Sequence, residues 1–107
     1  MTAFLIVRTS LDSKDAAQKI AESMVKERLA ACCWVSGPIQ STYWWQGKLE
    51  QAEEWVCEFK TRKELYAELE QAIKAIHSYD EPEVVAIPVV EGSRSYLDWI
   101  VHETARA

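Results

Sequence analysis

Two patterns of apolar positions predict the first elements of the chain. Residues 3–9 (AFLIVRT) form a nearly continuous apolar run, which is typical of a strand that is covered within a sheet. Apolar residues then recur at helical spacing over residues 17–25, with charged residues between them. Asp12 or Ser13 is placed to cap this helix, which we expect to reach about Ala31.

A long hairpin is predicted next. Residues 32–45 are extended in character, and the Gly37-Pro38 pair indicates a bulge or bend within them. Residues 46–48 (QGK) supply the turn, and residues 53–61 return with strict alternation of apolar and polar side chains. The apolar members of one face of this returning strand are Trp55, Cys57 and Phe59.

A second helix follows the hairpin. Thr61 and Glu64 have the T-x-x-E spacing of a capping box, which predicts that the helix begins behind them. The apolar residues that recur at helical spacing are Leu65, Leu69, Ala72, Ile73 and Ile76. Such a stripe is typical of a helix that packs against a core, and this helix is expected to end near His77.

The last two elements complete the fold. Residues 84–90 predict a strand, which Pro88 confines to a sheet edge or an unpaired position. Residues 93–104 predict a short C-terminal helix. The resulting order, β-α-β-β-α-β plus a terminal helix, predicts an α+β, ferredoxin-like fold in which helices pack on one face of an antiparallel sheet. Because no repeat or linker interrupts it, the chain is predicted to form a single domain over residues 1–107.

Strand lengths predict that part of the hairpin extends beyond the sheet. At roughly 3.3 Å per residue, the first strand spans about 23 Å, whereas hairpin arms of about twelve to fourteen residues reach roughly 40 Å. The overhang carries Tyr43, Trp44 and Trp45, whose rings lie beside adhesive strand edges. We expect another subunit to cover these rings. The alternative is that the C-terminal helix of the same chain folds back over them.

Composition and charge argue against nucleic-acid binding and against enzyme activity. The net charge of −5 and the pI of about 5.0 argue against nucleic acid as a ligand. An RNA-recognition module shares the predicted element order, but EWVCEFK lacks the glycine and the positive charge expected there. An acylphosphatase-like enzyme would need a phosphate-binding loop after the first strand, and TSLDSK has no glycine. With two histidines in the chain, no catalytic Ser–His–Asp or Cys–His grouping can be assembled, so no enzyme activity is expected.

The cysteines and the length of the apolar runs indicate the cellular compartment of the protein. Cys32, Cys33 and Cys57 are odd in number and include a vicinal pair, and no signal peptide is recognised, which together indicate a reducing cytoplasm. Apolar runs fall far short of the ~20 residues that span a bilayer. We therefore expect a cytoplasmic protein that has no membrane association.

Several segments of the chain closely resemble one protein family. ERLAACCWVSGPIQSTYWWQGKLE, followed by FKTRKELYAELEQAIKAIHSYDEPEVVAIPVVEGSRSYLDWI, is similar to the CutA divalent-cation tolerance proteins over nearly the whole chain. The resemblance implies a tight homotrimer of ferredoxin-like subunits, similar in assembly to the PII signalling proteins. It also implies hairpins that cross between subunits, clefts at the interfaces, and a link to tolerance of copper and other divalent metals.

The resemblance also supplies candidate site residues. The residues that match the strand-three lysine and the H-x-Y-x-x-PE segment of the family's inter-subunit cleft are Lys60, His77, Tyr79, Pro82 and Glu83. A neutral imidazole of His77 and a carboxylate of Glu83 or Glu81 are the predicted ligands for Cu(II) or another divalent cation, although no cofactor is required. Alternatively, His77 only caps the C-terminus of the second helix.

Three positions need separate interpretation. Arg8 stands where some bacterial members have a cysteine, and a guanidinium cannot ligate a metal. Arg8 and Lys60 near one cleft would instead suit an anion, so a PII-like trimer that binds a small anionic metabolite is the alternative function. Ser78 replaces a proline that is common in the family. Cys32 matches a family cysteine that is a possible metal contact, and here we expect a buried thiol.

Overall fold

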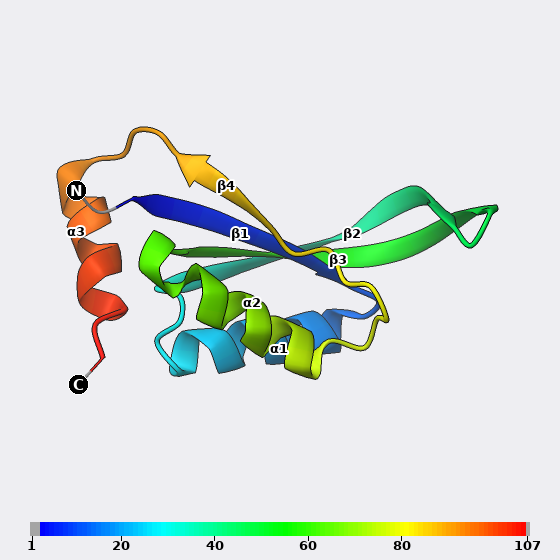
Figure 1. Ribbon diagram of the computed structural model, residues 1–107, viewed down its shortest axis with the longest axis horizontal. Coiled ribbons are helices and arrows are strands. Elements are labelled where there is room, and N and C mark those ends of the chain that lie inside the picture. The colour runs from blue at the N-terminus through cyan, green and yellow to red at the C-terminus, as the bar shows by residue number, and fades with distance from the viewer. Residues whose placement is uncertain (1–2, 107) are drawn as a thin grey trace.

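The computed structural model describes residues 3–106 and has the predicted order of elements (Figure 1). These elements are β1 (Phe4–Leu11), α1 (Lys14–Lys26), β2 (Cys32–Trp45), β3 (Lys48–Arg62), a 3₁₀ turn (Lys63–Leu65), α2 (Tyr66–Ile76), β4 (Val85–Val89) and α3 (Arg94–Glu103). The four strands form one antiparallel sheet in the order β2-β3-β1-β4. Pro88 therefore lies on an edge strand, as predicted. The α+β, ferredoxin-like fold is confirmed.

The core lies between the sheet and two helices. Helices α1 and α2 lie side by side over one face of the sheet, as Figure 1 shows. The residues of the core that are almost completely buried include Val7, Leu11, Ile20, Met24, Cys57, Phe59, Leu69 and Ile73. Alternation along β1 and β3 places the remaining side chains of these strands on the opposite, open face.

The first helix is shorter than predicted. Ser13 caps it, because the Ser13 hydroxyl accepts a hydrogen bond of 3.1 Å from the Ala16 backbone N–H. The helix ends at Lys26 rather than near Ala31, since Arg28 adopts a left-handed conformation with a φ of 62°. The buried segment after it, residues 29–31, then leads directly into β2. No helix within residues 3–106 is long and apolar enough to cross a lipid bilayer.

The predicted capping box at the second helix is wrong. Thr61 belongs to the buried face of β3, and its hydroxyl donates a hydrogen bond of 2.7 Å to the Leu29 carbonyl. A 3₁₀ turn follows instead, with Arg62 as its N-cap residue and without a side-chain cap. The strand continues through the threonine because its side chain finds a tertiary partner across the core, and this competes successfully with a local cap.

The hairpin extends past the sheet, as predicted. Strand β1 ends at Leu11, opposite Trp55, so residues 39–45 of β2 and residues 48–54 of β3 pair only with each other. Helix α3 lies at the other end of the molecule from the hairpin tip, as Figure 1 shows. The alternative interpretation, in which this helix covers the rings within one chain, is therefore wrong.

The three aromatic rings of the overhang are open to solvent in the single chain. Trp44 is 72% exposed, Tyr43 is 42% exposed and Trp45 is 40% exposed. Trp44 and Trp45 are consecutive strand residues, so their side chains point to opposite faces of the ribbon. The overhang thus presents apolar surface on both faces.

A bulge in β2 marks the base of the overhang. The β2–β3 register shifts between Ser36 and Ile39, as the Gly37-Pro38 pair predicts. Gly37 has a φ of 148°, which side chains rarely tolerate. A Cβ atom there would lie 2.8 Å from Cδ1 of Trp55 and 2.9 Å from the Glu54 carbonyl oxygen. The bulge therefore requires glycine for both conformation and space.

Candidate functional site

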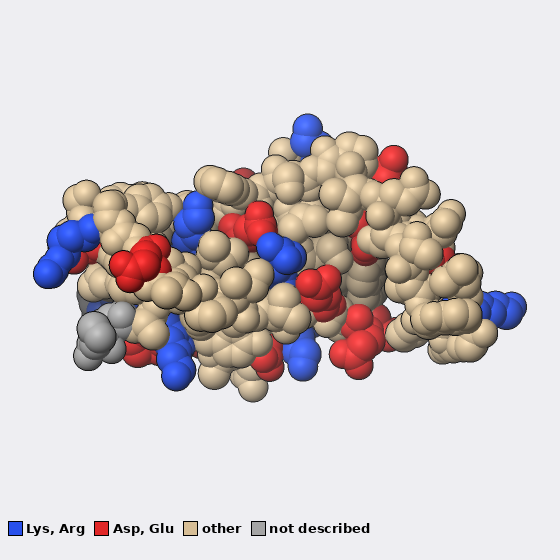
Figure 2. Space-filling model, turned by 90° about the horizontal axis from the view of Figure 1, so that it is seen from above, with Lys and Arg blue, Asp and Glu red and all other residues tan. Residues whose placement is uncertain are grey.

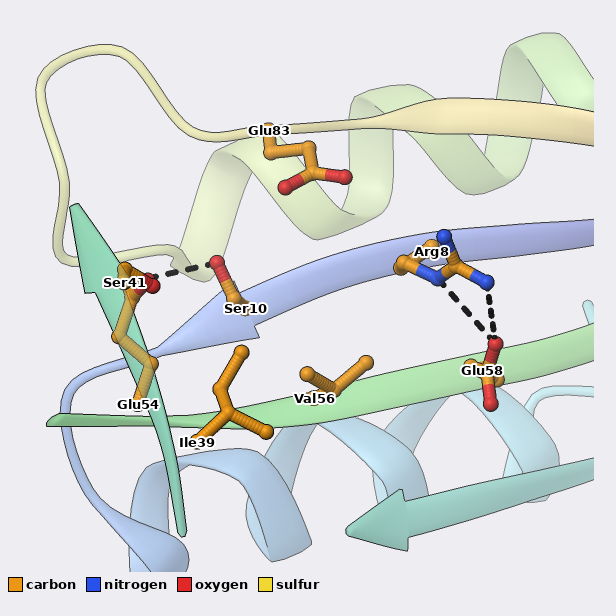
Figure 3. A pocket seen from close by; sticks show the side chains of 8 residues that line it. All are labelled: Arg8, Ser10, Ile39, Ser41, Glu54, Val56, Glu58 and Glu83. Carbon is orange, nitrogen blue, oxygen red and sulfur yellow. Dashed lines mark hydrogen bonds and ion pairs between the residues drawn. The ribbon is translucent and has the colours of Figure 1, made fainter. Parts of the chain in front are cut away.

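A cavity of about 400 Å³ lies on the open face of the sheet, where the hairpin leaves the body. It lies on a surface where acidic and basic side chains are interspersed, as the view in Figure 2 illustrates for one face of the molecule. The residues that line it, all labelled in Figure 3, are Arg8, Ser10, Ile39, Ser41, Glu54, Val56, Glu58 and Glu83. They come from β1, β2, β3 and the segment before β4, so the fold assembles the cavity from distant parts of the chain.

The charges of the cavity lining favour a cation. Arg8 and Glu58 face each other across β1 and β3, and Nη2 of Arg8 lies 2.7 Å from Oε2 of Glu58. The remaining charged side chains are Glu54 and Glu83, so three carboxylates accompany one guanidinium. Because Glu58 already offsets the charge of Arg8, this lining does not favour the anion site inferred from Arg8 and Lys60.

Glu54 is a buried carboxylate that sequence reasoning missed. Its residue surface is 7% exposed, and its Oε2 atom accepts hydrogen bonds from the Tyr79 hydroxyl at 2.6 Å and the Ser10 hydroxyl at 3.4 Å. The Ser41 hydroxyl donates to its other oxygen, Oε1. Strand alternation places Glu54 on the same face as Glu58, but only the tertiary contacts of Ser10, Ser41 and Tyr79 reveal its burial.

Burial and the adjacent carboxylate both raise the pKa of Tyr79. Burial is the larger cause, and the hydrogen bond to Glu54 adds to it because ionised tyrosine could not donate to the carboxylate. Since the folded pKa exceeds the unfolded value of about 10, the stabilisation is fully present below pH 10 and is lost as the pH rises through the folded pKa.

We therefore expect Tyr79 to stay protonated at pH values where an ordinary tyrosine has ionised. Absorbance at 295 nm, titrated from pH 8 to pH 12 on the folded wild type and on Tyr79→Phe, should differ little below about pH 11. A phenolate signal near pH 10 that is present in the wild type and missing from the variant would contradict this assignment.

The side chain of His77, which follows α2 directly, is hydrogen-bonded to β1. Its Nε2 atom donates a hydrogen bond of 2.8 Å to the Ser10 carbonyl, and its Nδ1 atom accepts one of 3.1 Å from the Tyr79 backbone N–H. This pattern requires the neutral ring with its proton on Nε2. His77 occupies the C-cap position of α2, but its ring nitrogens bond Ser10 and Tyr79 rather than a carbonyl at the end of α2, so the capping role given as the alternative stays a prediction. Both ring nitrogens are engaged, so metal ligation would require one of these hydrogen bonds to break.

Lys60 lies apart from the cavity. Its Nζ atom lies 3.6 Å from the centre of the Trp34 ring and 5.8 Å from that of Tyr96, which is a cation–π arrangement. Cys32 is the cross-strand partner of Lys60, and its sulfur lies 3.8 Å from the Tyr96 hydroxyl oxygen. Cys32 is half-buried rather than fully buried, whereas Cys57 is the buried thiol.

The predicted site residues thus fall into separate groups. Arg8 and Glu83 line the cavity, while Tyr79 reaches it through Glu54 and His77 is tied to its edge at Ser10. Lys60 and Pro82 are not among the lining residues. Within residues 3–106, no three His, Cys, Asp or Glu side chains are grouped so that they could hold a metal ion.

Comparison with known proteins decides the family. The family model described as "CutA1 divalent ion tolerance protein" matches residues 5–103. The chain belongs to the CutA1 divalent ion tolerance family. The divalent-cation tolerance protein CutA of Thermus thermophilus is 38% identical over 99 residues, which cover 92% of this chain and 96% of the relative.

Other members of the CutA1 family are similar in structure or longer in sequence. A solved structure of the divalent cation tolerance protein of Thermus thermophilus matches with a TM-score of 0.92 and 37% identity, covering 95% of this chain and 99% of that one. The chloroplastic CutA 1 protein of Oryza sativa is 38% identical over 94% of this chain, which spans only 56% of that protein's length. The shared unit is therefore the ferredoxin-like domain.

Proposed function

We propose that the chain acts without catalysis, as a cytoplasmic homotrimer that binds a divalent cation such as Cu(II) weakly and contributes to metal tolerance. Relatives such as the Thermus thermophilus protein are named for divalent-cation tolerance. The observation that supports binding here is the cavity, where Glu58 pairs with Arg8 and Glu54 accepts from three hydroxyls, which leaves the carboxylate of Glu83 for a cation. Carboxylate oxygens are suitable ligands for divalent cations. The three free cysteines support a reducing compartment.

The homotrimer is supported by surface that one chain leaves open. The overhang exposes aromatic rings on both faces, and the open face of the sheet adds the exposed side chains of Trp34, Val85 and Ile87. Large exposed apolar patches on a small domain are typical of subunit interfaces. Because no three-ligand group occurs within the described part of one chain, the proposed cation would take ligands from more than one subunit.

Isothermal titration calorimetry with Cu(II) and Zn(II) tests the metal assignment. If Glu83 is a ligand, Glu83→Gln should weaken binding about tenfold, which corresponds to about 1.4 kcal/mol. Glu91→Gln is the matched control, because Glu91 is exposed and lies outside the cavity lining. His77→Ala tests the other predicted ligand in the same titration. Unchanged binding in both Glu83→Gln and His77→Ala would refute the proposed ligands.

A further inference from the structure

The overhang begins where three features of the chain coincide. Strand β1 ends at Leu11, the bulge at Gly37 interrupts β2, and Glu54 is the first residue of β3 beyond the part that pairs with β1. A bulge bends and twists a strand locally, and a two-stranded ribbon has no further neighbour to hold its direction. Contacts at this point therefore decide where the ribbon points.

Four side chains meet at this base, and we call them the hinge cluster. They are Ser10, Ser41, Glu54 and Tyr79. The Glu54 carboxylate accepts hydrogen bonds from the Ser10 hydroxyl of β1, the Ser41 hydroxyl of β2 and the hydroxyl of Tyr79 in the loop after α2. Figure 3 shows Ser10 and Ser41 converging on the Glu54 carboxylate from different strands. The cluster thus ties both arms of the hairpin to the body.

The loop that carries the tyrosine is itself held in place. His77 donates to the Ser10 carbonyl and accepts from the Tyr79 N–H, and the two rings pack with centroids 4.8 Å apart. A buried carboxylate needs its hydrogen-bond donors, since unpaired buried charge is strongly unfavourable. Glu54 makes no ion pair within residues 3–106, so the three hydroxyls are the donors that hold it.

We infer that the hinge cluster sets the direction of the overhanging hairpin and thereby decides whether its aromatic tip reaches a second copy of this chain. The inference rests on the proposed homotrimer. Seven residues of strand span about 23 Å, so a change of about 10° at the base displaces the tip by roughly 4 Å. A shift of that size would remove the close packing that aromatic contacts between subunits need.

Tyr79→Phe tests this inference because it removes one hydroxyl and keeps the ring beside His77. Tyr66→Phe is the matched control, since Tyr66 lies on α2 outside the hinge cluster. Hydrogen–deuterium exchange of residues 39–54 should become about tenfold faster in Tyr79→Phe alone, as expected for loss of one hydrogen bond to a charged group. Light scattering on dilution should show dissociation at a protein concentration about tenfold higher.

Ser41→Ala provides a second variant should Tyr79→Phe fail to fold, and it should have the same two effects. Wild-type exchange and wild-type dissociation in the folded variant would overturn the inference. A wild type that is monomeric at all concentrations would instead overturn the proposed trimer and, with it, the role of the hinge cluster in reaching a partner. The exchange rates of the monomer would then still show whether the cluster holds the hairpin.

Discussion

Replacement of both Trp44 and Trp45 by serine is expected to leave the subunit folded and to convert the proposed trimer into monomers. Both side chains lie beyond the end of β1 and make no part of the buried core. Truncating a large aromatic residue at the centre of an interface commonly costs about 2 kcal/mol or more. Two such losses correspond to a roughly thousandfold weaker association. Size-exclusion chromatography with light scattering would measure the mass, and circular dichroism would verify the fold.

The control for this experiment is Ile76→Ser. Ile76 is also a large exposed apolar residue, at 52%, but it lies at the end of α2 rather than on the hairpin. This variant should keep the mass of the wild type. If the double tryptophan variant stayed trimeric on dilution, or if both variants dissociated alike, the assignment of the overhang as the assembly surface would be wrong.

Phe59→Ala is expected to remove much of the stability of the subunit. Phe59 is fully buried on the helix-facing side of β3, where it packs within the core shared with α1 and α2. Replacing a buried phenylalanine by alanine costs about 3–5 kcal/mol, from lost burial and the cavity that remains. Since domains are stable by about 5–15 kcal/mol, urea unfolding at fixed protein concentration should show a large shift of the midpoint.

Phe4→Ala makes the same chemical change at the other phenylalanine of the chain. Phe4 is half-buried at the start of β1, so its replacement should cost clearly less free energy of unfolding than the replacement of Phe59. Equal losses at the two positions would show that the core is not centred where the buried face of β3 meets the helices.

Local patterns were sufficient for most of the fold. Alternation in β3 separates Cys57 and Phe59, which face the helices, from Glu58 and Lys60, which do not. Pro88 indicated an edge strand, and the unequal strand lengths indicated the overhang. These features depend on neighbouring residues alone, through the side-chain period of a strand and the missing N–H of proline.

The errors occurred where a distant partner prevailed over a local preference. Thr61 has the spacing of a helix cap, yet the Leu29 carbonyl takes its hydroxyl. The apolar periodicity predicted that the first helix continues past Lys26. The helix ends there instead, and Leu29 and Ala30 are buried in the core. Leu29 lies about thirty residues before Thr61 in the chain. The core residues that surround Leu29 and Ala30 also come from distant strands and helices, so a short window of sequence contains neither contact.

The candidate site divides in the same way. Similarity to the CutA family identified Arg8, His77, Tyr79 and Glu83, and these residues do lie in or beside one cavity. It did not indicate that Arg8 is paired with Glu58, that both nitrogens of His77 are engaged, or that Glu54 is buried. These properties arise from contacts between strands and loops, so no spacing along the chain could express them.

The order of the elements and the long aromatic hairpin therefore follow from the sequence, because periodicity and strand length are local properties, while the family was indicated by the resemblance of whole segments. The charge balance of the cavity and the hinge cluster follow only from the folded arrangement. There, Ser10, Ser41 and Tyr79 reach one carboxylate from separate segments. Burial and hydrogen bonding of a charge depend on which groups surround it in space, and the fold alone brings these groups together.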